Sequence, residues 1–184
     1  MTLNRLKKIW DNGEYALNGW LSINNSFIAE IMSRQNYDTL TIDMQHGLID
    51  YSDLIGMLQG ITGSNVTPIV RVPWLDPGYI MKALDAGAQG IISPMINNKQ
   101  EAEEFVSYMR YPPLGNRSFG PTRQNFIQGS DYYKTANENV LCIAMIETAE
   151  AMKNLEEIIS TDGLDAVYIG PADLTLGTTE GRLS

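Results

Sequence analysis

The chain has 184 residues, of which 43% are hydrophobic and 19% charged, and its formal net charge at pH 7 is −9. This composition is typical of a globular protein, and an acidic chain without a basic cluster argues against nucleic acid as a partner. No apolar run approaches the roughly 20 residues of a membrane span, and a single cysteine, Cys142, excludes an intrachain disulfide. We therefore expect a cytoplasmic protein without a membrane partner.

Short apolar runs alternate with amphipathic segments along the chain. Strands are predicted at residues 19–23, 39–44, 67–72, 90–93, 140–146 and 166–169. Helices are predicted after the first five strands, at residues 26–34, 51–61, 77–86, 99–109 and 148–159. This alternation is typical of βαβ units and a parallel sheet, so we expect a single α/β catalytic domain over residues 1–184.

Residues 111–131 interrupt the alternation. They are rich in proline and glycine, and Arg110, Arg117 and Arg123 lie in them or beside them. A structureless loop of this length in a compact α/β domain is usually functional, so we expect a lid or an interface.

Two carboxylates follow apolar strands near the C-terminal end. Glu147 comes directly after residues 140–146, and Asp173 comes shortly after residues 166–169. Side chains at the carboxyl ends of neighbouring parallel strands meet at one edge, where two carboxylates, waters and a chelating substrate can hold Mg²⁺ or Mn²⁺. Ordinary acids at a helix N-terminus are the alternative.

Three more polar residues could carry chemistry. His46, the only histidine, follows the second strand beside Asp43 and is a natural general base near neutral pH. Arg71 ends the third strand and needs an anion there, either a substrate oxyanion or, in a structural ion pair, Asp43 or Asp85. Asp85 ends a helix, where it could orient an imidazole or simply be solvated.

Six strands with intervening helices suit a doubly wound sheet or part of a barrel. No glycine-rich dinucleotide-binding motif follows the first strand, which favours the barrel. A closed (β/α)8 TIM barrel has eight strands and typically about 250 residues. We expect an incomplete barrel of about six βα units without the last two strands, whose open edges another chain would cover if the protein ended at Ser184.

Several short motifs occur together and in order: Asp43-x-x-His46-Gly47, Arg71-Val72-Pro73, Leu84-Asp85-Ala86-Gly87-Ala88, Arg110-Tyr111-Pro112-Pro113-x-Gly115-x-Arg117, Glu147 and Ile169-Gly170-Pro171-Ala172-Asp173-Leu174. With this set the chain closely resembles the HpcH/HpaI aldolase family, within the pyruvate/phosphoenolpyruvate-binding barrel superfamily. Each motif alone is weak, but the ordered set is highly specific and spans essentially the whole chain.

The resemblance implies a metal-dependent (class II) pyruvate aldolase that reversibly cleaves 4-hydroxy-2-oxo acids to pyruvate and an aldehyde. It implies that Glu147 and Asp173 hold a divalent metal, Mg²⁺, Mn²⁺ or Co²⁺. It further implies that the substrate binds at Gly170, Ala172 and Asp173, with the backbone at Ala172 touching the pyruvate carboxylate.

The resemblance also assigns the remaining polar residues. Arg71 would stabilise the enolate oxygen, His46 and Asp85 would form an acid/base dyad, and Asp43 would support the His46 loop. Packing of the family's last helices between subunits implies a homo-oligomer.

The chain departs from the family pattern at Gln45, where an acidic residue is frequent, and at Met145, where glutamine is frequent. It also ends two βα units early, so we expect weak activity from this chain alone. Two alternatives stay open. One is a CoA-ester lyase of the citrate or malyl-CoA type, with the CoA phosphates on the arginines of residues 110–123. The other is a non-catalytic chain that associates with full-length subunits.

Overall fold

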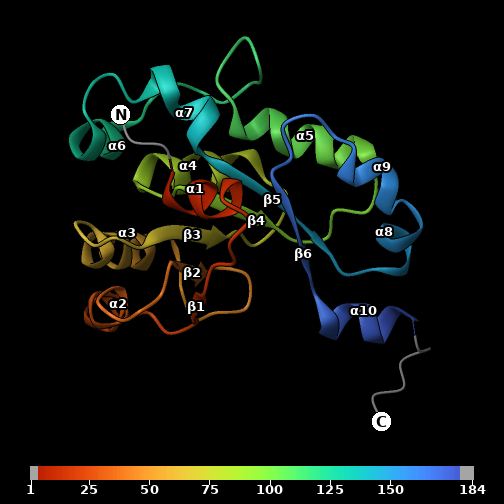
Figure 1. Cartoon of the computed structure of the whole chain (residues 1–184), viewed down its shortest axis with the longest axis horizontal. Helices are drawn as coiled ribbons and strands as arrows, with labels where there is room; N and C mark the ends of the chain where they lie inside the picture. The colour runs from red at the N-terminus through yellow and green to blue at the C-terminus, as the bar shows by residue number, and fades with distance from the viewer. Residues whose placement is uncertain (1–3, 179–184) are drawn as a thin grey trace.

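A computed structural model describes residues 4–178 of the protein, so the last residues of the sequence, including Ser184, lie outside the described part. A curled, parallel six-stranded sheet of order β1-β2-β3-β4-β5-β6 forms its centre (Figure 1). The strands are β1 (Asn18–Leu21), β2 (Thr39–Asp43), β3 (Thr67–Arg71), β4 (Gly90–Ser93), β5 (Leu141–Ile146) and β6 (Ala166–Ile169). This α/β half-barrel confirms the six predicted strands and their parallel order.

Helices follow the strands in turn and cover the outer face of the sheet (Figure 1). They are α2 (Ser26–Ser33), α3 (Tyr51–Ile61), α4 (Pro77–Ala86), α5 (Lys99–Met109), α8 (Ala149–Lys153), α9 (Leu155–Ile159) and α10 (Pro171–Thr178). The starts of five are fixed by side chains that accept a backbone N–H of the first turn: Asn25, Asp50, Asp76, Asn98 and Thr148. Within residues 4–178, no helix is both long and apolar enough to cross a membrane.

Three regions differ from the sequence prediction. The N-terminal helix α1 (Arg5–Asp11) was not predicted. The expected structureless loop contains α6 (Thr122–Gln128), and α7 (Tyr133–Asn139) follows it. The helix expected at residues 148–159 is broken into α8 and α9 at Asn154, whose side-chain amide donates to the Asn97 carbonyl at 2.8 Å.

Strand side chains alternate between two environments. One set, including Ile42, Val70 and Ile91, packs against the helices in the main core. The other set, including Ile92 and Ile143, faces the barrel interior. Because successive residues of a strand point to opposite faces, the polar residues that end the interior set all point inward at the carboxyl edge.

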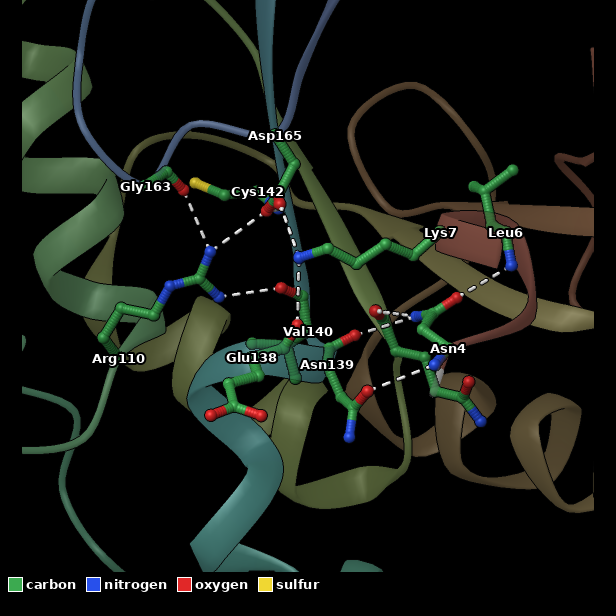
Figure 2. A network of polar contacts seen from close by, with 11 residues as sticks. Asn4, Leu6, Lys7, Arg110, Glu138, Asn139, Val140, Cys142, Gly163 and Asp165 are labelled. Carbon is green, nitrogen blue, oxygen red and sulfur yellow. Dashed lines mark hydrogen bonds and ion pairs between the residues drawn. The ribbon is translucent and has the colours of Figure 1, made fainter. Parts of the chain in front are cut away.

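The interior is closed at one end by α1. Leu6 of this helix packs against the interior side chains, and a cavity of about 200 Å³ remains beside it, lined by residues of β1 and β6 such as Asn18 and Tyr168. Asn4 caps α1 and its side-chain amide donates to the carbonyls of Gln89 and Asn139, at 3.1 and 2.9 Å (Figure 2). The helix is therefore fixed at the amino ends of the strands.

A second part of the same network centres on Arg110 and Asp165 (Figure 2). Arg110 donates to the carbonyls of Val140 and Gly163 at 2.7 and 2.9 Å and to Asp165 at 3.0 Å. The Asp165 carboxylate also accepts the Cys142 N–H at 2.9 Å and lies 3.3 Å from the Lys7 ammonium. A buried guanidinium thus joins the end of α5 to the starts of β5 and β6.

We expect Asp165→Asn to lower the free energy of unfolding by about 3–5 kcal/mol, because it leaves the buried Arg110 cation unpaired. Lys7→Met is the matched control, since a partly exposed ion pair contributes only about 0–1 kcal/mol. Urea unfolding followed by circular dichroism measures both variants. Equal losses for the two substitutions would contradict the role given to Arg110.

Candidate active site

The inward-facing polar residues meet at the carboxyl edge of the sheet. Asp43 and Arg71 are register partners at the ends of β2 and β3. Ile146 and Ile169 are partners at the ends of β5 and β6, so Glu147 and Gly170 follow directly on neighbouring strands. The carboxyl ends of parallel barrel strands are where such folds place their chemistry, which makes this edge the candidate site.

Arg71 and Asp43 form a buried, bidentate ion pair. Arg71 Nε and Nη2 donate to the two Asp43 carboxylate oxygens at 2.9 and 2.6 Å. Burial raises the pKa of Asp43, but the hydrogen bonds and charge of Arg71, with the His46 N–H, outweigh it and hold the pKa below its ordinary value. Asp43 therefore stays ionised and fixes the plane of the guanidinium.

Trp20 holds the same guanidinium from its face, and sequence reasoning missed this residue. The Arg71 guanidinium lies 4.9 Å from the centre of the Trp20 ring, and the Trp20 Nε1–H donates to Asp43 at 3.3 Å. Trp20 is in turn stacked on Tyr168 of β6, with ring centres 5.7 Å apart. The sequence signal that could have identified Trp20 was its position on the first strand, where the alternation of side chains points it inward.

One edge of Arg71 has no strong acceptor among residues 4–178. Within that part of the chain its Nη1 atom contacts the Met145 sulfur, at 3.8 Å, and a thioether is a weak acceptor. The Nη1 edge of the guanidinium can therefore donate to an anionic ligand in the site.

Glu147 is buried, with 1% of its surface exposed, and its two oxygens differ. Oε1 accepts the Met95 N–H at 2.8 Å, whereas Oε2 has no hydrogen-bond partner among the described residues. Burial raises the pKa of Glu147, and the neighbouring Asp173 carboxylate adds to this rise against the opposing effects of Met95 and Arg71. Two carboxylates that repel each other, one with an unused buried oxygen, fit a site for a cation.

Gly170 keeps the space beside Glu147 open. A Cβ at this position would lie 2.8 Å from Glu147 Oε2 and 2.6 Å from the Met145 methyl carbon, so no larger residue fits. Helix α10 begins at Pro171, which places Ala172 and Asp173 in its first turn. First-turn N–H groups have no partner within their helix, so this backbone can receive an anion.

His46 lies in the loop after β2, and its side chain is exposed. Its backbone N–H donates to Asp43 at 3.3 Å, so Asp43 supports this loop as well as Arg71. Gly47 permits the tight turn, because a Cβ there would lie 2.2 Å from the Asp43 carbonyl oxygen. The structure therefore places the imidazole at the carboxyl edge without a fixed partner among residues 4–178.

The structure does not bring Asp85 to His46. Because α4 runs from the carboxyl edge back toward the amino edge, Asp85 in its last turn lies away from the site. Its partner is Arg117, whose Nη2 donates at 2.7 Å. Burial raises the pKa of Asp85 although Arg117 opposes this effect. Within this chain Asp85 forms an ion pair between α4 and the segment after α5, and its dyad with His46 stays a prediction.

The arginines of residues 110–123 are all engaged in structural contacts. Arg110 binds Asp165, Arg117 binds Asp85 and the Tyr132 hydroxyl, and Arg123 binds the Ala86 carbonyl and Thr62. These contacts pack the segment onto α4 and α3 rather than over the candidate site. They also leave no free cluster of these arginines for CoA phosphates, which weakens the CoA-ester lyase alternative.

Within residues 4–178, no three His, Cys, Asp or Glu side chains gather into a ready metal cage. The two carboxylates of Glu147 and Asp173 nevertheless suit a hard divalent cation that keeps waters and takes further oxygens from a substrate. Together with the Arg71 edge and the first turn of α10, they can bind a small oxo acid.

The sheet and the polar residues at its carboxyl edge define a parallel α/β half-barrel with a candidate site for a small anion. A family model described as HpcH/HpaI aldolase/citrate lyase matches residues 17–182. The chain therefore belongs to the HpcH/HpaI aldolase/citrate lyase family, as its motifs predicted.

Named relatives agree with this membership. The chain is 47% identical over 174 residues to a hydroxypyruvate/pyruvate aldolase of Rhizorhabdus wittichii, covering 95% of this chain and 69% of the relative. It is 38% identical over 177 residues to a 4-hydroxy-2-oxo-heptane-1,7-dioate aldolase of Escherichia coli, covering 94% and 67%. The structure superposes with a TM-score of 0.88 on a family protein from Burkholderia cenocepacia, with 34% identity over 95% of this chain and 71% of the other.

Proposed function

We propose that the chain is a divalent-metal-dependent aldolase that cleaves 4-hydroxy-2-oxo acids to pyruvate and an aldehyde, and catalyses the reverse addition. The observation that carries this proposal is Glu147, buried beside Asp173 and Arg71 with one carboxylate oxygen unused. The names of two relatives, both aldolases of oxo acids, support the same reaction.

The metal would be held by Glu147 and Asp173, and Mg²⁺, Mn²⁺ and Co²⁺ all suit two carboxylates with waters. A bound divalent cation supplies Lewis-acid polarisation of the oxo group. The unused Glu147 Oε2 and the space kept by Gly170 support this assignment.

The other residues act on the oxo acid directly. The backbone at Ala172 receives the carboxylate at the first turn of α10, next to Gly170. Arg71 presents its Nη1 edge to the oxo oxygen, on which negative charge develops as the carbon–carbon bond breaks. Because Asp43 and Trp20 hold the guanidinium before the reaction, no reorientation is needed when that charge appears.

His46 removes the proton of the C4 hydroxyl as the bond to the leaving aldehyde breaks. Its position on the Asp43-supported loop at the carboxyl edge supports this role. Within the chain Asp85 binds Arg117. Only the Asp85 of another copy of the chain could therefore complete the dyad with His46.

We also propose that the half-barrel is part of a (β/α)8 domain in a homo-oligomer. Among the described strands, β1 and β6 each pair on one side only, and an apolar cavity lies between them. The chain spans about two thirds of the length of its named relatives. Exposed apolar side chains such as Phe126 support association between copies.

The test is pyruvate release from a 4-hydroxy-2-oxo acid by the purified chain, with Mn²⁺ and with excess chelator. We expect release that the chelator abolishes and that His46→Ala lowers by about 10²–10⁴-fold, the usual contribution of a general base. Release that persists undiminished in chelator would contradict the proposed metal. Mn²⁺ binding without release would favour the non-catalytic alternative.

A further inference from the structure

The loop between β4 and α5 contains a strained residue. Met95 has φ +57°, the only non-glycine residue with positive φ in the described part of the chain. A methionine in this conformation is strained, so its surroundings must hold it there. Its position two residues after Ser93 puts it at the same carboxyl edge as Glu147.

The side chain of Asn97 fixes the conformation of this loop. Its side-chain amide donates to the Met95 carbonyl at 2.9 Å, and its side-chain oxygen accepts the Thr148 hydroxyl in a short hydrogen bond. The Asn97 N–H donates to Glu101 at 2.6 Å, and its carbonyl accepts from Asn154. One asparagine therefore ties the loop to α5 and to the segment that directly follows Glu147.

The conformation of this loop directs the backbone N–H of Met95 toward Glu147. The Met95 N–H reaches Glu147 Oε1 at 2.8 Å, which leaves the buried Oε2 to face Gly170. A carboxylate fixed through one oxygen presents the other in a single direction, and such supporting contacts typically change metal affinity by about 10–100-fold.

We propose that Asn97 and the backbone of Met95 are positioning residues that orient Glu147 for a divalent cation. This inference rests on the proposed metal site. It assigns no role to the Met95 side chain, only to its φ and its N–H.

Mn²⁺ binding to the full chain, measured by isothermal titration calorimetry, tests the inference. We expect Asn97→Ala to weaken Mn²⁺ binding by about tenfold or more. Met95→Gly should bind within about twofold of the wild type, since glycine keeps the N–H and adopts positive φ without strain. The matched control is Asn98→Ala, which removes the N-cap of α5 in the same loop without touching Met95. It should lower the melting temperature and leave Mn²⁺ affinity unchanged.

Two outcomes would overturn the inference: Asn97→Ala binding Mn²⁺ as the wild type does, or Asn98→Ala losing affinity to the same extent. A large loss in Met95→Gly would also overturn it, because that loss would assign the role to the side chain. A wild-type chain that binds no Mn²⁺ would instead refute the proposed metal site itself, so the two failures are distinguishable.

Discussion

Arg71→Lys should lower kcat/KM for cleavage of a 4-hydroxy-2-oxo acid by about 10²–10³-fold, the usual effect of losing one preorganised donor to a developing oxyanion. Lysine cannot bind both Asp43 oxygens, stack on Trp20 and still present a second edge to the substrate, because its ammonium is a single point. Arg71 does all three through separate atoms.

Steady-state kinetics of pyruvate release measure this loss, and calorimetry should show Mn²⁺ affinity within about threefold of the wild type. Arg34→Lys is the control, because Arg34 forms an exposed ion pair with Glu30 far from the site and should have no effect. Activity of Arg71→Lys within about threefold of the wild type would contradict the role given to the guanidinium.

Glu147→Gln should abolish Mn²⁺ binding at millimolar metal and, with it, metal-dependent pyruvate release. The substitution keeps the size of the side chain but removes the charge that attracts the cation, leaving only Asp173. The protein should stay folded, because the mutual repulsion with Asp173 is also removed and burial of a neutral amide costs less than burial of a carboxylate.

The paired control is Glu150→Gln, in the exposed first turn of α8 three residues along the chain. It changes the net charge by the same amount and should leave both Mn²⁺ affinity and pyruvate release as they are. If the Glu147→Gln protein still bound Mn²⁺ with wild-type affinity, the metal would have to bind at another site.

The strand ends of the site could be predicted from the sequence because each follows an apolar run. Asp43, Arg71 and Glu147 come where runs of buried strand residues stop, and parallel pairing then brings them to one edge. The same alternation predicts which of them point inward. This part of the site follows from local sequence and the period of a strand.

Other parts depend on contacts between distant residues. The sequence around Met95 does not by itself indicate positive φ, because Asn97 holds the loop only together with Thr148, 51 positions later. Trp20 in a four-residue strand is indistinguishable from a core residue until β2 and β3 place Asp43 and Arg71 against it. The break between α8 and α9 likewise depends on a distant residue, because the side-chain amide of Asn154 donates to the carbonyl of Asn97, 57 positions earlier.

Asp85 has a different partner within this chain from the one that the family resemblance implies. The resemblance pairs it with His46, but Asp85 directly precedes the end of α4 and Gly87, and that end lies toward the amino edge. The direction of α4 therefore separates Asp85 from His46 within one chain, and the pairing itself stays a prediction. Arg117 gives the carboxylate a partner that sequence spacing did not suggest.

The most direct test of the central claim is exchange of the pyruvate methyl protons in D₂O, followed by proton NMR with the chain and Mn²⁺. This half-reaction needs the carboxylates, Arg71 and a base, but no particular aldehyde. The account predicts exchange that requires Mn²⁺, stops with chelator and is lost in Glu147→Gln and Arg71→Lys. Exchange that proceeds equally in both variants would contradict the site at the carboxyl edge of the half-barrel.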